Sequence, residues 1–319
     1  MFFQSVRYQV SFWNGPELLQ GDLVIPPGPG PHPAVLLFGG VQGPRDRGRW
    51  INLLAQSGLA VLSWDSPGWG GSTGGRGWQP PGERTMELLA AVDFLRDVRD
   101  VQGDRLGVIS SDLGCWAAAL AAGLSSRVGA LIMLTPPCTG AMEHELIRIE
   151  HRMRGLGFIA AEVGLAQLVL HERIRRLLAG YHPEGIWAAE APCRAAPWYG
   201  WLPGGTPTEI AAFGGMAGYD PRALLSPVHC PVLAVLGADD TASPQGSADR
   251  LATALSWSGT PDQRVIVVPR TDDALRPVWA VDPNRPRPPG DWHPELIGVL
   301  VEWLAPRIGR LSPTDAAAR

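Results

Sequence analysis

Short apolar runs that alternate with helix-length stretches are the feature of this sequence that most restricts its fold. The alternation begins after the loop "PPGPGPHP" and returns near the end of the chain. The predicted strands cover residues 34–38, 60–64, 105–109, 130–134, 232–236 and 265–268, and the predicted helices cover 50–57, 85–98, 116–123 and 294–308. Strands buried on both faces and separated by helices are typical of a doubly wound, mostly parallel sheet. We therefore predict an α/β fold.

Two other segments extend this plan. Residues 5–13 and 18–25 alternate in polarity around "NGPE", which predicts an antiparallel hairpin at one edge of the sheet. Between residues 138 and 223 the alternation gives way to helix-like segments rich in Arg, Glu and Trp, which predicts a helical cap inserted over the carboxyl edge of the sheet. We thus expect a core of residues 1–137 and 224–310, a cap of residues 138–223 and a disordered tail, "LSPTDAAAR", at 311–319.

Composition narrows the classes of function. A chain of 319 residues with 45% hydrophobic content can bury a large core, and its net charge of -4 offers no basic surface for nucleic acid. No apolar run approaches the length of a membrane span. Every cationic side chain among the 27 is arginine, so lysine chemistry is excluded.

The four cysteines are scattered without the spacing of a metal site, which favours a reducing cytoplasm and predicts neither metal nor cofactor. We expect a small-molecule substrate and no nucleic-acid or membrane partner, and we leave a homodimer open.

The stretch "GVISSDLGCW", residues 107–116, carries the main chemical signal. An apolar strand runs into a tight turn and then into an Ala-rich helix, the arrangement that presents a nucleophile in a strand–turn–helix elbow. The reactive side chain of such an elbow stands two residues before a glycine, because the turn has no room for a Cβ there. Counting back from Gly114 gives Asp112 in place of the usual serine.

Together with the elbow, four more ordered motifs resemble the α/β-hydrolase superfamily, in particular its bacterial peptidase-like and esterase-like members with a helical cap. The motifs are "LLFGGVQGPRD", "LSWDSPGWGGSTG", "YDPRALLSPVHCPVLAVLGADD" and "VVPRTDDALRP". The resemblance implies a nucleophile position at Asp112, a triad acid at Asp240 and, where the family has histidine, Asp273. It also implies an oxyanion hole formed by the backbone N–H groups of Val41 and Leu113. Two of the three triad positions depart from the Ser, Asp, His set.

This altered triad favours acid/base chemistry. Carboxyl groups at Asp112 and Asp273 that share one site cannot both ionise easily, so one becomes an acid and the other a base, with Asp240 behind them. Arg270 either holds one carboxylate ionised or is a solvated loop residue. Suitable reactions are cyclisation, ring opening or isomerisation, in specialised biosynthesis.

Two alternatives remain. Haloalkane dehalogenases and epoxide hydrolases, which the elbow also resembles, form an ester on an elbow aspartate, and a histidine-activated water cleaves it. Here that base would be His293 in "GDWHPEL", which equally suits the start of the last helix, or a histidine of the cap at 144, 151, 171 or 182. The third possibility is a non-catalytic binding protein with a degenerate triad.

Aromatic residues suggest the kind of ligand. Four of the 13 tryptophans lie beside the elbow or in the predicted cap, namely Trp116, Trp187, Trp198 and Trp201. Aromatic walls suit a small hydrophobic metabolite, although core packing explains many such rings as well.

Overall fold

The computed structural model describes residues 5–39, 48–75, 79–216, 218–240, 246–272, 275–277 and 296–309, and the fold is reported for these ranges. They contain one sheet whose strands follow the order β1-β2-β4-β3-β5-β6-β7-β8. The strands are β1 Val6–Asn14, β2 Glu17–Ile25, β3 Ala34–Phe38, β4 Ala60–Trp64, β5 Leu106–Ser111, β6 Val128–Leu134, β7 Val232–Gly237 and β8 Gln263–Val268. Strands β1 and β2 form the expected hairpin at the sheet edge, and β2 pairs antiparallel with β4. The other strand pairs are parallel, so the predicted mostly parallel sheet is confirmed.

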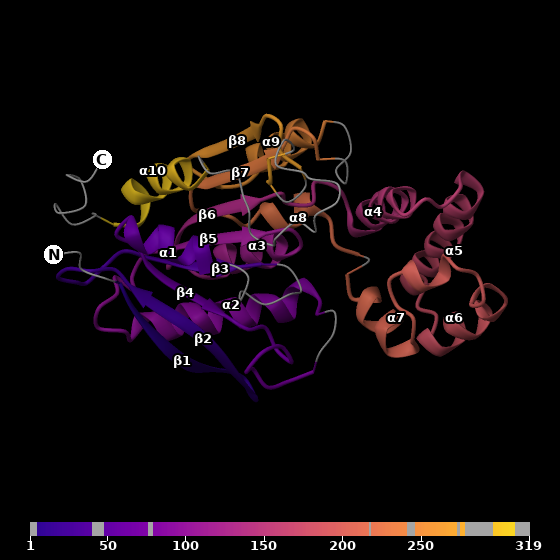
Figure 1. Ribbon diagram of the computed structural model, residues 1–319, viewed down its shortest axis with the longest axis horizontal. Coiled ribbons are helices and arrows are strands. Elements are labelled where there is room, and N and C mark those ends of the chain that lie inside the picture. The colour runs from indigo at the N-terminus through magenta and orange to yellow at the C-terminus, as the bar shows by residue number, and fades with distance from the viewer. Residues whose placement is uncertain are drawn as a thin grey trace.

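Helices cover both faces of the sheet, as Figure 1 shows. The helices are α1 Gly48–Gln56, α2 Pro81–Arg96, α3 Gly114–Leu124, α4 Ala141–Gly155, α5 Ala160–Leu178, α6 Pro183–Ala189, α7 Pro207–Gly214, α8 Pro221–Leu225, α9 Ser247–Ser256 and α10 Leu296–Ile308. Helices α2, α3, α8 and α9 pack on one face, and α1 and α10 pack on the other. Strand β3 serves both layers, because Leu36 and Phe38 face the first while Val35 and Leu37 face the second.

Several predicted boundaries shift for local reasons. Helix α2 begins at Pro81, four residues earlier than expected, because proline suits the first turn of a helix where no N–H partner is needed. Strand β5 continues to Ser111, two residues further than expected. Ser110 stays in the strand because its buried hydroxyl donates to the carbonyl of Ile132 at 3.1 Å. The expected tail and the start of the last helix, 294–295, lie outside the described residues.

Between β6 and β7 the chain forms a group of helices that we call the helical lobe, residues 141–214. It contains α4 to α7 and two short 3-10 helices, η2 Ala191–Cys193 and η3 Tyr199–Trp201. The lobe has its own apolar core, which includes Ile149, Leu170 and Phe213. In Figure 1, α5, α6 and α7 lie at one end of the molecule beside the sheet, and α4 runs between them and the strands.

No helix in the described part of the chain combines the length and apolar character needed to cross a membrane.

Candidate functional site

The turn after β5 has the elbow conformation that the sequence predicts. Asp112 adopts φ 51°, in the left-handed region that side chains other than glycine rarely occupy. Two backbone bonds hold it: its N–H donates to the carbonyl of Leu134 at 3.0 Å, and its own carbonyl accepts from the N–H of Cys115 at 2.9 Å. Helix α3 begins directly afterwards at Gly114. Such strain persists only where the surroundings fix it, and it is common at functional sites.

Gly114 lets the chain segment after β3 approach the elbow. A Cβ atom on Gly114 would lie 3.1 Å from the carbonyl carbon of Gly39, closer than most real Cβ contacts. The backbone of Gly39 is held in turn by Arg84 of α2, whose Nη2 donates to its carbonyl oxygen at 2.7 Å. Arg84 also pairs with buried Glu87 at 3.1 Å. A buried ion pair therefore fixes the segment that leads to the predicted oxyanion donor.

Asp112 is an exposed residue, yet enough protein surrounds its carboxyl group to shift the pKa. Desolvation raises its pKa, which is the largest effect. His144 and Arg148 oppose this shift by their charge, Glu145 adds to it, and the backbone N–H of Leu113 lowers the pKa by donating a hydrogen bond. The predicted oxyanion donor Leu113 thus contacts the elbow carboxyl itself.

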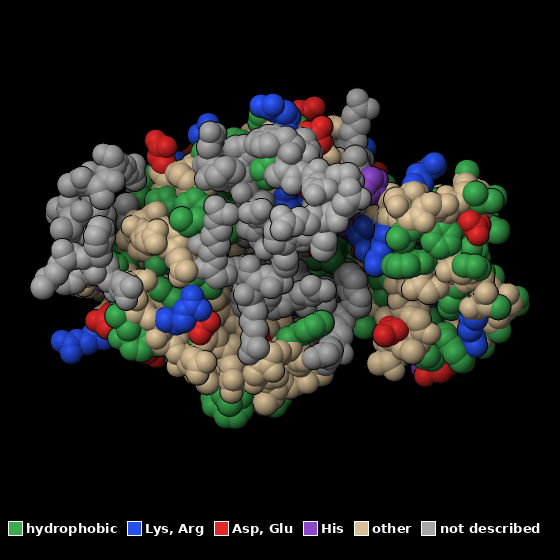
Figure 2. Space-filling model, viewed as in Figure 1, with side chains coloured by type: hydrophobic (Ala, Val, Ile, Leu, Met, Phe, Trp, Pro, Cys, Tyr) green, Lys and Arg blue, Asp and Glu red, His purple; other side chains and the backbone are tan. Residues whose placement is uncertain are grey.

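Helix α4 of the lobe supplies three charged or titratable groups that act on Asp112, namely His144, Glu145 and Arg148. His144 and Glu145 are buried, with exposed fractions of 7% and 1%. Arg148 binds Glu145 through two nitrogens, Nε at 3.0 Å and Nη2 at 2.6 Å, so these two side chains neutralise each other. Figure 2 shows Arg and His side chains at the boundary between the sheet-bearing part and the lobe.

The first turn of α4 is anchored beside the elbow. Ala141 belongs to a small apolar cluster with Trp116 of α3, and Leu113 packs against the same cluster. The N–H of Ala141 donates to the carbonyl of Tyr219 at 3.2 Å. Glu143 forms an ion pair at 3.3 Å with Arg250 of α9. These contacts explain why a helix of the lobe reaches Asp112.

Sequence analysis named His144 only as one of four cap histidines, and it missed Glu145 and Arg148. The usable signal was the stretch "HELIR", which puts His144 and Arg148 one helical turn apart on a common face. The stretch also begins only ten residues after β6, whose carboxyl end meets the elbow edge of the sheet.

The described parts of the loops after β7 and β8 lie side by side. The N–H of Asp239 donates to the carbonyl of Thr271 at 2.9 Å. This approach needs a glycine at position 237, because a Cβ there would lie 2.2 Å from the carbonyl oxygen of Asp272. Asp272 in turn binds Arg276 at 2.9 Å, which closes the second loop.

Asp240, the predicted triad acid, is partly exposed near Cys138, which lies in the segment between β6 and α4. The pKa of the Cys138 thiol is raised to about 12, chiefly by burial and to a smaller extent by the charge of Asp240. Arg270, the predicted partner of a carboxylate, is exposed and has φ 54°. Asp273, His293 and Val41 lie outside the described residues, so the expected meeting of Asp112 with Asp273 stays a prediction.

A cleft of about 510 Å³ opens next to Cys138. Residues of α8, α9 and the start of α4 line it, among them Arg222, Arg250 and the exposed ring of Trp257. The cleft lies next to the loop that carries Asp240, because Cys138 borders both the cleft and that loop.

The other polar residues near the elbow have structural partners. Ser110 is fully buried, and its hydroxyl donates to the backbone carbonyl of Ile132. Cys115 is buried under the start of α3, and desolvation raises the pKa of its thiol. Asp65 accepts a hydrogen bond from the N–H of Gly71 at 3.0 Å and so holds the loop after β4.

The four tryptophans predicted to bind substrate have different surroundings. Trp116 is buried, donates to the carbonyl of Pro137 at 3.3 Å and stacks on Tyr219. Trp198 is buried in the core of the lobe. Trp201 lies under the guanidinium of Arg152, 4.5 Å from its ring centre. Contact of these rings with a substrate stays a prediction.

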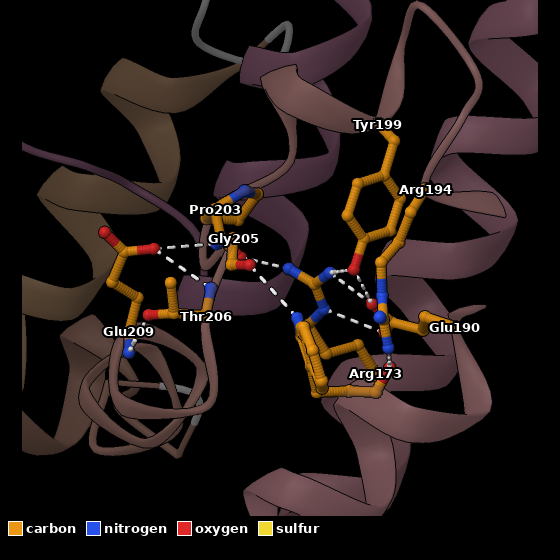
Figure 3. A network of polar contacts seen from close by, with 9 residues as sticks. Arg173, Glu190, Arg194, Tyr199, Pro203, Gly205, Thr206 and Glu209 are labelled. Atoms are coloured by element: carbon orange, nitrogen blue, oxygen red, sulfur yellow. Dashed lines mark hydrogen bonds and ion pairs between the residues drawn. The ribbon is translucent and has the colours of Figure 1, made fainter.

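Trp187, the fourth ring, belongs to a region of the lobe held by a buried polar network, which Figure 3 shows. Its indole N–H donates to the carbonyl of Gly205 at 3.1 Å. At the centre of the network Arg173, which has no exposed surface, donates to Glu190 at 2.9 Å and to the carbonyl of Pro203. Tyr199 donates to the same carboxylate at 2.7 Å. The network joins α5 to the segments on either side of η3.

Comparisons with known proteins agree with this geometry. No protein-family model matches the chain. A curated relative, the 2,6-dihydropseudooxynicotine hydrolase of Paenarthrobacter nicotinovorans, is 32% identical over 109 residues, which are 34% of this chain and 29% of that enzyme. The match therefore spans less than a third of the relative's length.

Solved structures match almost the whole chain. DcsB, solved in complex with its substrate analogue, has a TM-score of 0.62 at 16% identity, covering 96% of this chain and 100% of that one. An esterase from Pyrococcus furiosus has a TM-score of 0.63 at 15% identity, covering 96% and 92%. A 2,6-dihydroxy-pseudo-oxynicotine hydrolase has a TM-score of 0.57 at 19% identity, covering 95% and 68%. The chain has the α/β-hydrolase fold.

Proposed function

On this fold, we propose that the chain is an enzyme in which the Asp112 carboxyl group transfers a proton to or from a small, largely apolar substrate. The observation that carries the proposal is the placement of Asp112. It stands at the apex of a strained elbow, open to a ligand, with helix α4 of the lobe beside it. A residue held in this conformation without a structural need for its side chain is a good candidate for a functional group.

The electrostatics of the site support proton transfer. Desolvation raises the pKa of Asp112, so its carboxyl group retains a proton at higher pH than an ordinary aspartate. A protonated carboxyl group can donate its proton to an epoxide or carbonyl oxygen. The resulting carboxylate can then accept a proton as a base. Proton transfer by a positioned side chain contributes about 10²–10⁴ in rate.

The rest of the site is proposed from the sequence motifs. The backbone N–H groups of Leu113 and Val41 are proposed to stabilise the developing oxyanion, and Asp240 and Asp273 to complete the set of acids and bases. The helical lobe is proposed to act as a cap. The reaction class is cyclisation, ring opening or isomerisation of a metabolite.

A hydrolytic route is the second candidate, and the names of the relatives favour it. The curated relative is a hydrolase of 2,6-dihydropseudooxynicotine, and an esterase is among the similar structures. In this route the Asp112 carboxylate attacks an epoxide or a carbon–halogen bond, and water then cleaves the ester formed. A raised pKa of Asp112 disfavours this route, because it lowers the fraction of carboxylate in the free enzyme.

Isotope labelling separates the two routes. The protein is incubated with a panel of small apolar epoxides, enones and lactones, and the products are analysed by mass spectrometry. Protein in excess over a converted substrate is then given one turnover in ¹⁸O-water and digested with trypsin, which releases the peptide 106–127 that contains Asp112. Proton transfer predicts no label in this peptide, whereas the covalent route predicts ¹⁸O in Asp112.

The variant Asp112→Asn provides the direct test. It keeps the shape of the side chain but cannot exchange a proton, so we expect turnover to fall by a factor of about 10² or more. Full turnover by this variant would overturn the proposal. Tight binding of a panel compound by both proteins, with no turnover by either, would instead support a non-catalytic binding protein.

A further inference from the structure

Helix α4 brings one histidine of the lobe close to the elbow. The loop after β8, in which the α/β-hydrolases that this chain resembles have their histidine, has Asp273 in this sequence. His144 lies one turn into α4, just after the anchoring contacts of Ala141 and Glu143. The His144 residue is buried, with 7% of its surface exposed. No side chain in the described part of the chain forms a hydrogen bond or ion pair with its imidazole. Its ring nitrogens are also not among the fully buried, unpartnered side-chain atoms of the described residues, so the imidazole keeps an accessible edge at which it can exchange a proton.

The two charged groups of α4 near Asp112 pair with each other, which leaves His144 without an ion-pair partner on its own helix. Among the described residues, the charged side chains that act on Asp112 include Glu145 and Arg148, both on α4 itself. Glu145 and Arg148 are held together by hydrogen bonds of 2.6 to 3.1 Å, so their charges compensate each other. Asp112 and His144 remain, and each acts on the charge of the other.

We propose that His144 is the proton-transfer partner of Asp112, so that the base of this site comes from the helical lobe and not from the loop after β8. The inference rests on the proposed function and adds a second catalytic residue to it. The substrate it implies has a hydroxyl or activated C–H group as proton donor and an epoxide or carbonyl oxygen as acceptor.

The proposed step is balanced without another reactant. Neutral His144 removes the proton from the hydroxyl or C–H group while the Asp112 carboxyl donates its proton to the acceptor oxygen. In a ring opening, the new bond forms at the epoxide carbon as its C–O bond breaks, and the oxygen receives the proton. The resulting imidazolium and carboxylate then return to the neutral pair by proton transfer between them.

A carboxyl-directed epoxide, 1,2-epoxy-3-(4-nitrophenoxy)propane, tests the pair without knowledge of the natural substrate. The probe reports on the imidazolium and carboxylate state of the pair: the Asp112 carboxylate forms an ester C–O bond, the epoxide C–O bond breaks, and the His144 imidazolium gives its proton to the alkoxide. We expect His144→Gln to slow labelling of the peptide 106–127 at least tenfold. The pH midpoint of labelling should also move upward, because removal of the His144 charge raises the pKa of Asp112 further. A purely structural role of His144 does not predict this shift.

His151→Gln is the matched control, because His151 is an exposed histidine on the same helix. We expect its labelling rate to stay within about twofold of the wild-type value. Circular dichroism and thermal unfolding of each variant establish whether the chain is folded. If His144→Gln does not fold, His144→Asn is used in its place.

The possible outcomes are distinct. Equal labelling rates and midpoints in the wild type and in folded His144 variants would overturn the inference and leave the role of Asp112 intact. Undiminished turnover of a panel substrate by folded His144→Gln would also overturn it. Failure of the proposed function is recognised separately, by undiminished turnover of the substrate panel by Asp112→Asn.

Discussion

Arg84 donates a hydrogen bond of 2.7 Å to the carbonyl oxygen of Gly39, and through it helix α2 holds the backbone that packs against the elbow glycine Gly114. The same arginine pairs with Glu87, which also accepts a hydrogen bond of 2.7 Å from the indole of Trp64. One buried carboxylate therefore connects β4, α2 and the segment next to the proposed catalytic group.

The substitution Arg84→Met should destabilise the protein by about 3 kcal/mol, because it leaves the buried Glu87 carboxylate without its partner. The double variant Arg84→Met/Glu87→Met should recover part of that loss, because no buried charge then remains. Urea unfolding measures both. As a control, Arg96→Met removes an exposed arginine of the same helix and should leave the unfolding free energy nearly unchanged. A double variant less stable than the single one would contradict this account.

Asp112→Gly should stabilise the fold by about 1 kcal/mol and abolish activity. Glycine adopts the left-handed region without the steric cost that aspartate incurs there at φ 51°, although it loses more backbone entropy on folding. Differential scanning calorimetry measures the stability, and the substrate panel measures the activity. A variant less stable than the wild type would show that the side chain contributes to the structure of the elbow.

The stability difference between Asp112→Asn and the wild type should grow with pH. A raised pKa in the folded state means that folding favours the protonated carboxyl. The resulting stabilisation is fully present below the unfolded value of about 3.9 and is lost as the pH rises through the folded value. Asparagine does not titrate, so urea unfolding between about pH 4 and about pH 8 should increasingly favour the variant. The exposed Asp104→Asn provides a comparison that we expect to show no such trend.

Gly237→Ala should lower both stability and turnover. Its Cβ would lie 2.2 Å from the carbonyl oxygen of Asp272 and 2.6 Å from that of Thr271, so the two loops that end at Asp240 and Asp272 must separate. Gly164→Ala is the matched control, because it lies in helix α5 with open space around it and should stabilise the protein by up to about 1 kcal/mol. Thermal unfolding compares the two, and equal melting temperatures would be the contrary result.

Glu190→Gln should loosen the helical lobe while the sheet stays intact. Glu190 is the carboxylate that accepts from Arg173 and Tyr199, and its loss leaves a fully buried guanidinium uncompensated. Hydrogen exchange measured by mass spectrometry should accelerate in α5 to α7 and remain slow in β5 and β6. Exchange that increases equally in both regions would show that the lobe and the sheet unfold together.

The fold was accessible from sequence because strand burial leaves a direct pattern. Runs such as 34–38 and 60–64 are apolar on both faces, and the structure places β3 and β4 at these same residues. The elbow could be predicted for a similar reason, because its turn requires a glycine two residues after Asp112. The structure shows the cause: the backbone of Gly39 lies too close to Gly114 for a Cβ.

The surroundings of Asp112 were less accessible. Periodicity assigns His144 to a helix but does not say which way that helix lies, and its direction depends on long-range contacts such as Glu143 with Arg250. The extension of β5 through Ser110 was missed for the same reason, because a serine in a buried strand depends on a hydrogen bond to the neighbouring strand.

The hydrogen bond from the N–H of Ala141 to the carbonyl of Tyr219 places the chain's entry into the lobe next to its return. Because these two points meet, the intervening helices form an insertion, or detour, that begins and ends at the same place on the sheet-bearing part. Insertions and deletions within such a detour leave strand pairing untouched, which gives evolution, or a protein engineer, a place to exchange whole helices and so alter substrate preference while the elbow is retained.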